Sequence, residues 1–166
     1  MATLTHLDPA GRPAMVDVGD KPVTARRALA EGRVSLPPSV AACLVGDELD
    51  SRKGPVYHSA ILAGTLAAKR TAELIPLCHT LPLERLRVWI ETEPRPDGAA
   101  EAVIRCEAAL HGRTGVEMEA LTAVAVAALT VVDMCKALSH EMVIHGIRLL
   151  EKEGGRRTVR DGRLVA

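Results

Sequence analysis

Aromatic residues are almost absent from this chain of 166 residues, which has no Phe, one Trp and one Tyr. Proteins that hold single-stranded nucleic acid commonly stack the bases on aromatic side chains, so the usual platform for that contact is missing. The hydrophobic fraction is nonetheless 48%, and the core must therefore be built from Ala, Val, Leu and Ile. This length and apolar content suffice to bury one core, and we expect a single domain over residues 1–166.

Neither sign of charge is in excess, because 21 Lys and Arg balance 21 Asp and Glu. The sequence therefore has no basic field that would attract nucleic acid or an anionic membrane surface. Residues 1–15 lack the basic segment followed by an apolar core that marks a secretory signal, so we expect a cytoplasmic protein. The cysteines are scattered, with no CxxC pair and no metal-like cluster, which predicts reduced thiols and no metal site. They are Cys43, Cys78, Cys106 and Cys135.

What the chain does have is one long apolar stretch, TGVEMEALTAVAVAALTVVDMCK, from Thr114 to Lys136. Its run of 13 apolar or Thr residues is shorter than the roughly 20 that a membrane span needs, so it predicts a buried core helix over 115–138. Thr114 and Glu117 have the spacing of a capping box, which predicts that Thr114 is the N-cap.

Charged residues stand at both ends of this helix. Glu119 and Asp133 lie within about 40° of each other around the axis but about 21 Å apart along it, so one copy cannot bring both to a small ligand. Asp133 and Lys136, at i and i+3, can meet. Two interpretations stay open on spacing alone: the charges stabilise the helix dipole and cap, or they form a site to which a second subunit contributes.

The rest of the chain alternates in a way that predicts an α+β fold. Strands are expected over 23–36, 84–93, 100–110 and 142–152, and helices over 39–45 and 56–74. The order βαββαβ is the ferredoxin-like arrangement, an antiparallel sheet with helices packed on one face. We expect an irregular arm over 1–22, a polar loop over 46–55 and a mobile tail over 153–166.

Two loops and one helix surface hold further candidates. Lys53 lies in the polar loop, where a lysine is solvated by default, and Lys69 is expected to face solvent on its helix. His79 lies in an apolar segment, 75–83, that two prolines stiffen. A histidine in such a setting is either a hydrogen-bonded structural residue or a reactive group that the stiff loop positions.

Several longer motifs resemble one family. LIPLCH at Leu74–His79, TGVEMEALTA at Thr114–Ala123 and ALTVVDMCKA at Ala128–Ala137 are similar to signatures of the cyclic pyranopterin monophosphate synthases, the MoaC family of molybdenum cofactor biosynthesis. MVDV at 15–18 and the Lys53-Gly54 pair follow in the same order. The resemblance extends from about Leu4 to Gly155.

The resemblance implies a lyase that converts 3′,8-cyclo-7,8-dihydro-GTP into cyclic pyranopterin monophosphate and releases pyrophosphate. It also implies a ferredoxin-like fold and a homohexamer, a trimer of dimers, with active sites at subunit interfaces. No cofactor is required, and it is open whether Mg²⁺ accompanies the triphosphate. The residues that match the motifs are Asp133, Lys136 and Lys53 for catalysis, Leu77, Cys78, His79, Glu117, Met118 and Glu119 for substrate binding, and Lys69, Arg26 and Lys21 as candidates for the triphosphate.

The chain departs from the family pattern at two places. Gly154-Gly155 is followed by Arg156-Arg157-Thr158, where the family often has Lys-Ser-Gly, and Thr80 stands where a proline commonly follows the histidine. Two other functions remain as alternatives: a ferredoxin-like module that binds a metabolite without chemistry, and a pterin or nucleotide enzyme of another reaction type on the same scaffold.

Overall fold

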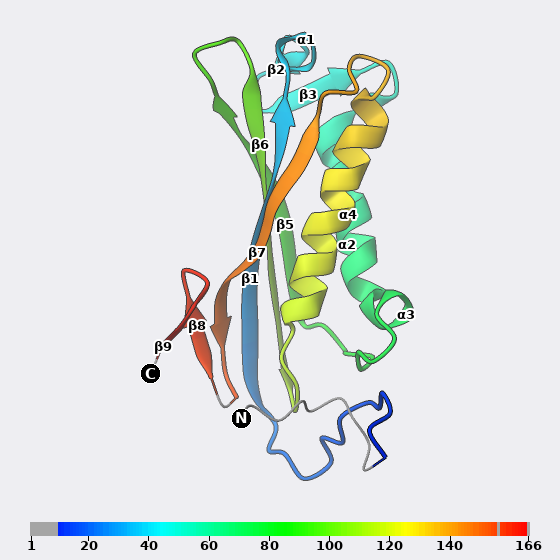
Figure 1. Cartoon of the computed structure of the whole chain (residues 1–166), viewed down its shortest axis with the longest axis vertical. Helices are drawn as coiled ribbons and strands as arrows, with labels where there is room; N and C mark the ends of the chain where they lie inside the picture. The colour runs from blue at the N-terminus through cyan, green and yellow to red at the C-terminus, as the bar shows by residue number, and fades with distance from the viewer. Residues whose placement is uncertain (1–9, 156, 166) are drawn as a thin grey trace.

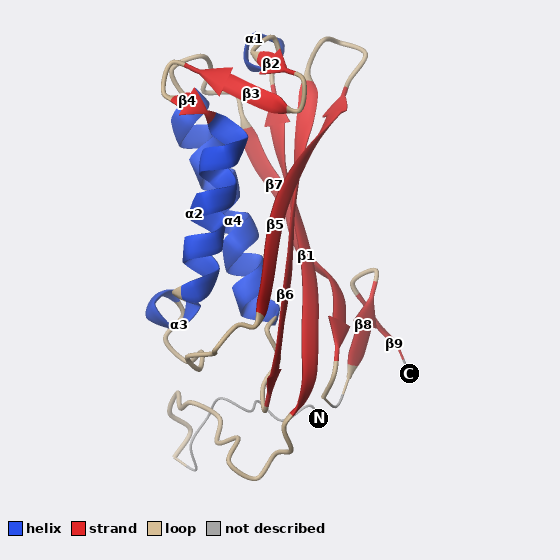
Figure 2. Ribbon diagram, turned by 180° about the vertical axis from the view of Figure 1, so that it is seen from behind, coloured by secondary structure: helices blue, strands red, loops and turns tan. Residues whose placement is uncertain are grey.

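A six-stranded antiparallel sheet with two long helices on one face forms the body of the chain (Figures 1 and 2). The computed structural model describes residues 10–155 and 157–165. The strands are β1 (Thr24–Leu36), β2 (Leu44–Val45), β3 (Glu48–Ser51), β4 (Gly54–Pro55), β5 (Arg85–Pro94), β6 (Ala100–Gly112), β7 (Val143–Glu153), β8 (Thr158–Arg160) and β9 (Arg163–Val165). The helices are α1 (Pro38–Ala41), α2 (Val56–Lys69), α3 (Thr71–Leu74) and α4 (Glu117–Cys135).

The large sheet has the order β5-β6-β1-β7-β8-β9, and β2-β3-β4 form a separate small sheet. The four long strands pair antiparallel throughout, and α2 and α4 cover one face. This order and this single helical layer are those of the predicted βαββαβ arrangement, so the α+β, ferredoxin-like prediction is confirmed.

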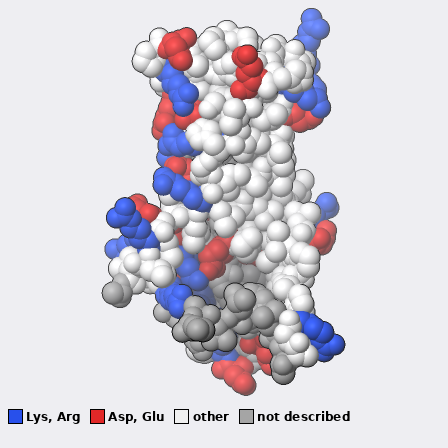
Figure 3. Space-filling model, in the orientation of Figure 1, with Lys and Arg blue, Asp and Glu red and all other residues white. Residues whose placement is uncertain are grey.

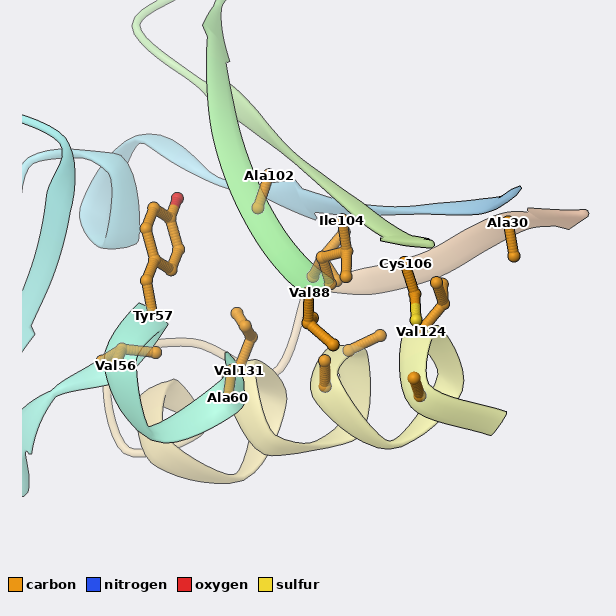
Figure 4. Close-up of a cluster of buried hydrophobic side chains, with 14 of the residues drawn as sticks. Ala30, Val56, Tyr57, Ala60, Val88, Ala102, Ile104, Cys106, Val124 and Val131 are labelled. Atoms are coloured by element: carbon orange, nitrogen blue, oxygen red, sulfur yellow. The ribbon is translucent and has the colours of Figure 1, made fainter. Parts of the chain in front are cut away.

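The core lies between the sheet and the helices and is built from small aliphatic side chains (Figure 4). On β1, Ala28, Ala30 and Val34 are fully buried, and on β6 so are Ala102 and Ile104. These residues follow the alternation read from the sequence, which places every second side chain on the helical face. Alanine at so many of these positions lets the helices approach the sheet closely.

Helix α4 is the central element of the helical layer. It is long and apolar enough to cross a membrane by length and composition, but Ala123, Val124, Ala127 and Val131 are fully buried in the core. A Cβ atom added at Gly64 of α2 would lie 2.7 Å from the Ala123 carbonyl oxygen. The glycine is therefore what allows α2 to touch the backbone of α4, and α4 has the burial pattern of a core helix.

The face of the sheet away from the helices carries a network of ion pairs. The Glu31 side chain is 5% exposed and lies 2.9 Å from the Arg105 guanidinium, 3.5 Å from that of Arg33 and 3.4 Å from that of Arg148. Arg105 also pairs with Glu91 at 2.5 Å. Buried carboxylates of this kind require such partners, so the charges on this face largely satisfy one another.

Two expectations for residues 39–55 are wrong. The predicted helix over 39–45 ends at Ala41, and the predicted loop over 46–55 contains two of the three strands of the small sheet. These strands are only two to four residues long. An alternation of apolar and polar residues cannot be recognised in so short a segment, which is why the sequence did not indicate them.

The predicted mobile tail over 153–166 instead extends the sheet within its described part, because β8 and β9 form a hairpin beside β7. Asp161 and Gly162 have φ values of 49° and 71°, which suits the tight turn of a two-residue hairpin. The Gly162 amide donates to the Leu150 carbonyl at 3.0 Å. Arg156 and Ala166 lie outside the described residues.

The predicted capping box at Thr114 is also wrong. The N-cap of α4 is Val116, and the Thr114 hydroxyl donates to the Gly115 carbonyl at 3.2 Å. The Glu117 carboxylate pairs with Lys152 of β7. The predicted helix over 56–74 is divided into α2 and α3.

In the arm, residues 10–22 are irregular apart from a bridge at Pro13, as predicted, and residues 1–9 lie outside the described part.

Candidate active site

Three candidate catalytic side chains meet at the C-terminal end of α4. Lys136 Nζ lies 2.6 Å from Asp133 Oδ1, and Lys53 Nζ lies 3.2 Å from Asp133 Oδ2 and 2.9 Å from the Asp133 carbonyl oxygen. We call these residues the acid–base cluster. Their side chains are 50–56% exposed. Hydrogen bonds from Lys136 and Lys53 hold the pKa of Asp133 below its usual value.

Lys53 reaches this cluster from the turn between β3 and β4. Ser51 and Gly54 pair across that turn, and the Ser51 hydroxyl donates to the Gly54 carbonyl at 3.1 Å while accepting the Lys53 amide at 3.1 Å. The expectation that this loop lysine is merely solvated is therefore wrong. Its ammonium group is half exposed but is bound to Asp133.

The N-terminal end of α4 presents a different environment. Glu119 is only 4% exposed, and burial raises the pKa of its carboxyl, with the neighbouring charge of Glu117 adding to the shift. Burial also raises the pKa of the Cys78 thiol, and the charge of Glu119 contributes. The two residues are thus close enough to interact, while Met118 beside them is exposed. When ionised, Glu119 can accept hydrogen bonds from a ligand through both carboxylate oxygens, whereas protonation turns one of these oxygens into a donor.

His79 lies in the proline-stiffened loop that ends near this end of α4. Its Nε2 lies 3.0 Å from the Val16 carbonyl oxygen of the N-terminal arm. A carbonyl can only accept, so Nε2 is the donor in this contact. This hydrogen bond is of the structural kind considered for His79. Leu77 and Cys78 are half-buried in the same loop.

Arg26 is the most constrained of the candidates for the triphosphate. It is 7% exposed, and its Nε and one terminal nitrogen donate to the carbonyls of Gly112 and Arg113 at 3.1 and 3.4 Å. Gly154 and Gly155 pass so close that a Cβ atom at Gly155 would collide with the guanidinium. Only glycine fits this approach, so the residues that follow β7 cover Arg26.

A cavity of about 630 Å³ opens beside Arg26. Its lining includes the guanidinium groups of Arg27 and Arg85, the imidazole of His111 and the carboxylates of Glu84 and Glu153. Arg27 is already engaged by Glu107 and Glu151 at 2.6 Å each.

Lys21 is half-buried and Lys69 is exposed at the last position of α2. Neither of these lysines lines the cavity.

The structure divides the predicted site into two parts. The acid–base cluster lies at one end of α4, whereas Glu117, Glu119, the 75–83 loop, the start of β1 and the end of α2 lie at the other (Figure 1). We call this second set of residues the recognition end. Within one chain the two parts stay apart by nearly the length of the helix, as its spacing predicts.

Lys152 is a cation at the recognition end that the sequence reasoning did not single out. It stands opposite Ala28 in the β1–β7 register, which places it on the helical face of the sheet, where it pairs with Glu117. The sequence did contain a signal for it, because Lys152 is a charged residue at a position where the alternation of the strand places apolar side chains.

Among residues 10–155 and 157–165, no group of three or more His, Cys, Asp or Glu is arranged to hold a metal ion.

Comparison with known proteins identifies the family. The model of the MoaC family matches residues 15–155. The chain belongs to the MoaC family. A cyclic pyranopterin monophosphate synthase of Xanthomonas axonopodis pv. citri is 55% identical over 160 residues, covering 95% of this chain and 93% of the relative. The protein of the same name from Chloroflexus aurantiacus is 54% identical over 154 residues, covering 92% and 91%.

The match to the MoaC family includes every candidate site residue, from Lys21 to Lys136. It ends at Gly155, the second glycine of the pair that covers Arg26. The residues that differ from the family pattern, 156–158, therefore lie beyond the matched region. Both parts of the divided site lie within the matched region.

Proposed function

We propose that this chain is a lyase that converts 3′,8-cyclo-7,8-dihydro-GTP into cyclic pyranopterin monophosphate and pyrophosphate. The two relatives described above are named for this activity, and this chain aligns with 93% and 91% of their lengths. The observation that carries the proposal is the contact of one carboxylate, Asp133, with two ammonium groups at hydrogen-bonding distance. The rearrangement moves several protons, and such a cluster can donate and accept them.

In the proposed mechanism Asp133 and Lys136 form a coupled acid–base pair, and Lys53 is a second proton donor or acceptor. A lysine exchanges protons near neutral pH only where burial or another cation lowers its pKa. In the single chain the three side chains are about half exposed. Closure of the cluster by a second subunit would supply the missing burial, which supports a site at a subunit interface.

The recognition end would bind the base. Ionised Glu119 and Glu117 can accept hydrogen bonds from guanine-type N–H groups, with Met118 beside them and Leu77, Cys78 and His79 as the facing loop. Burial favours the neutral form of Glu119, so hydrogen bonds from the substrate would stabilise its charged form. This is how a buried carboxylate can select a ligand that presents donors.

Arg26, Lys21 and Lys69 would hold the triphosphate. The described partners of the buried Arg26 guanidinium are backbone carbonyls, which carry no formal charge, so an anion beside it would be stabilised. Attack of a ribose-derived hydroxyl on the inner phosphate would then expel pyrophosphate. We propose that no resident cofactor takes part. If Mg²⁺ accompanies the triphosphate, a chelator will lower turnover and Mg²⁺ alone will restore it.

In assembly we propose a homohexamer, a trimer of dimers, in the cytoplasm. Leu62 and Leu66 of α2 and Leu129 of α4 are 66%, 55% and 58% exposed, and few charged side chains appear over the face of α4 in Figure 3. An apolar helical face of this kind suits contact with a second copy. Two antiparallel copies of α4 would bring the acid–base cluster of each subunit to the recognition end of the other.

A direct assay tests the reaction. Pure protein is incubated with freshly made cyclic dihydro-GTP, and both pyrophosphate and the oxidised fluorescent pterin are followed. Release of both products by the wild-type protein is expected, with turnover lost in Lys53→Ala, Asp133→Ala and Lys136→Ala. Binding without either product would instead favour the metabolite-binding module, and near-normal turnover in one variant would remove that residue from the mechanism.

A further inference from the structure

The N-terminus of α2 is capped by a side chain from outside the helix. Its N-cap residue is Pro55, which has no side-chain acceptor for the free amides of the first turn. Glu48 of β3 takes that role, because Oε1 accepts the Tyr57 amide at 2.6 Å and Oε2 accepts the His58 amide at 3.2 Å. His58 Nδ1 also contacts Oε2, and the Leu49 amide donates to Oε1 at 2.8 Å.

This carboxylate is firmly held as an anion. Burial pulls the pKa of Glu48 upward, but the hydrogen bonds from the Tyr57 amide, the His58 ring and the amides of Leu49 and His58 outweigh burial, so its pKa lies below the usual value. The side chain is only 22% exposed. Glu48 is therefore a charged, partly buried link between strand β3 and helix α2 near neutral pH.

The same strand leads directly into the turn that carries Lys53. β3 and β4 pair through Asp50 with Pro55 and Ser51 with Gly54, and Lys53 lies between them. A sheet of such short strands is only marginally stable alone. β4 continues directly into α2, the Leu49 side chain of β3 is buried, and the hydrogen bonds of Glu48 join β3 to the first turn of α2.

We propose that Glu48 is a positioning residue that fixes the β3–β4 turn against α2 and so holds the Lys53 ammonium group within reach of Asp133. The inference rests on the proposed role of Lys53. A continuous path of contacts joins Glu48 to Asp133. Glu48 fixes the turn to α2, α2 packs on α4 through Gly64, and α4 carries Asp133. The Lys53 side chain is long and flexible, so its placement depends on the position of its own backbone.

Three variants separate positioning from simple helix capping. In Glu48→Gln, the amide oxygen can replace Oε1 toward Leu49 and Tyr57, whereas the amide nitrogen cannot accept from His58. Glu48→Ala loses all of these bonds. Ser59→Ala is the matched control, because it removes one side-chain hydrogen bond at the same helix end, from the Ser59 hydroxyl to the Pro55 carbonyl at 2.8 Å, and leaves the bonds of Glu48 in place.

We expect kcat to fall at least about tenfold in Glu48→Ala and less in Glu48→Gln, with KM nearly unchanged, because small misplacements of a catalytic group are costly. Ser59→Ala should keep wild-type kcat. The acidic limb of the kcat profile should move to higher pH in Glu48→Ala, because Lys53 then contributes less to lowering the pKa of Asp133. A role in folding alone would lower the folded fraction, seen by circular dichroism, without moving this limb.

The inference is overturned if kcat and its acidic limb in both folded Glu48 variants match the wild type, or if the loss of kcat equals the loss of folded protein. Lys53→Ala is measured beside them. Normal turnover in Lys53→Ala would refute the proposed role of Lys53, whereas an inactive Lys53→Ala with fully active Glu48 variants would refute the positioning role alone.

Discussion

The two ends of helix α4 hold carboxylates in opposite conditions. At the C-terminal end Asp133 is exposed and bound by Lys136 and Lys53, which lower its pKa. At the N-terminal end Glu119 is buried, and burial with the charge of Glu117 raises its pKa. Nearness to cations thus favours the charged form at one end, and burial favours the neutral form at the other. In the proposed site the helix is a spacer between the acid–base cluster, which would transfer protons, and the recognition end.

Removing the carboxylate of the acid–base cluster should have the largest effect. Asp133→Asn keeps the size of the side chain but removes its basicity, so we expect kcat to fall about 10²–10⁴-fold, the range of general acid–base catalysis. Stability should change little, since the side chain is 56% exposed and exposed ion pairs contribute little. Steady-state kinetics and thermal unfolding measure both.

The control is Asp47→Asn, which changes an exposed aspartate in the turn before β3 and should leave kcat unaltered. If Asp133→Asn turned over substrate as fast as this control, the proton-transfer role of this end would be refuted.

The recognition end should respond through affinity and pH. Glu119→Gln retains one acceptor oxygen but loses the charge, so we expect KM to rise about tenfold, the scale of one hydrogen bond to a charged group, with a smaller change in kcat. In the wild type, kcat/KM should fall as the pH decreases through the raised pKa of Glu119, because protonation removes the negative charge and turns one acceptor oxygen into a donor.

In Glu119→Gln this acidic limb of kcat/KM should move to lower pH, since the raised pKa of Glu119 no longer sets it and Asp133 has a lowered pKa. A pH–rate series on both proteins measures the shift. An unchanged limb would mean that Glu119 does not titrate in the free enzyme in the way its burial indicates.

The smallest predicted effect is a difference in reactivity between two thiols, one at each end of α4. Burial raises the pKa of Cys135 to about 11, and the residue is fully buried beside the acid–base cluster. Cys78 at the recognition end is half-buried. Alkylation at pH 8 followed by peptide mass spectrometry should label Cys78 faster than Cys135, and substrate should slow the labelling of Cys78. Faster labelling of Cys135 would contradict this account of the two ends.

Periodicity predicted the parts of the fold that are long. The alternation along β1 and β6 and the apolar run of α4 were sufficient for the βαββαβ order, because each spans enough residues for its period to be seen. The small sheet around Glu48 was missed, since its strands are two to four residues long. The tail hairpin was missed because its strands are only three residues long, although Asp161-Gly162 is a pair typical of a two-residue hairpin turn.

The site was predictable to a similar degree. The i, i+3 contact of Asp133 and Lys136 follows from helix geometry alone, and so does the separation of Glu119 from Asp133. The contact of Lys53 with Asp133 joins residues 80 positions apart, which no local spacing can indicate, and only the family resemblance suggested it. The cap that Glu48 provides to α2 depends on tertiary contact and had no signal in the sequence.

The central claim is that each active site combines the acid–base cluster of one subunit with the recognition end of another. Complementation tests it most directly: Asp133→Asn and Glu119→Ala, each poorly active alone, are unfolded together, refolded as a mixture and assayed. With random pairing, half of the dimers are mixed and each holds one intact site of two, so about a quarter of wild-type turnover per subunit should return. Mixed oligomers that form but show no gain over the separate variants would contradict the claim and place the whole site within one chain.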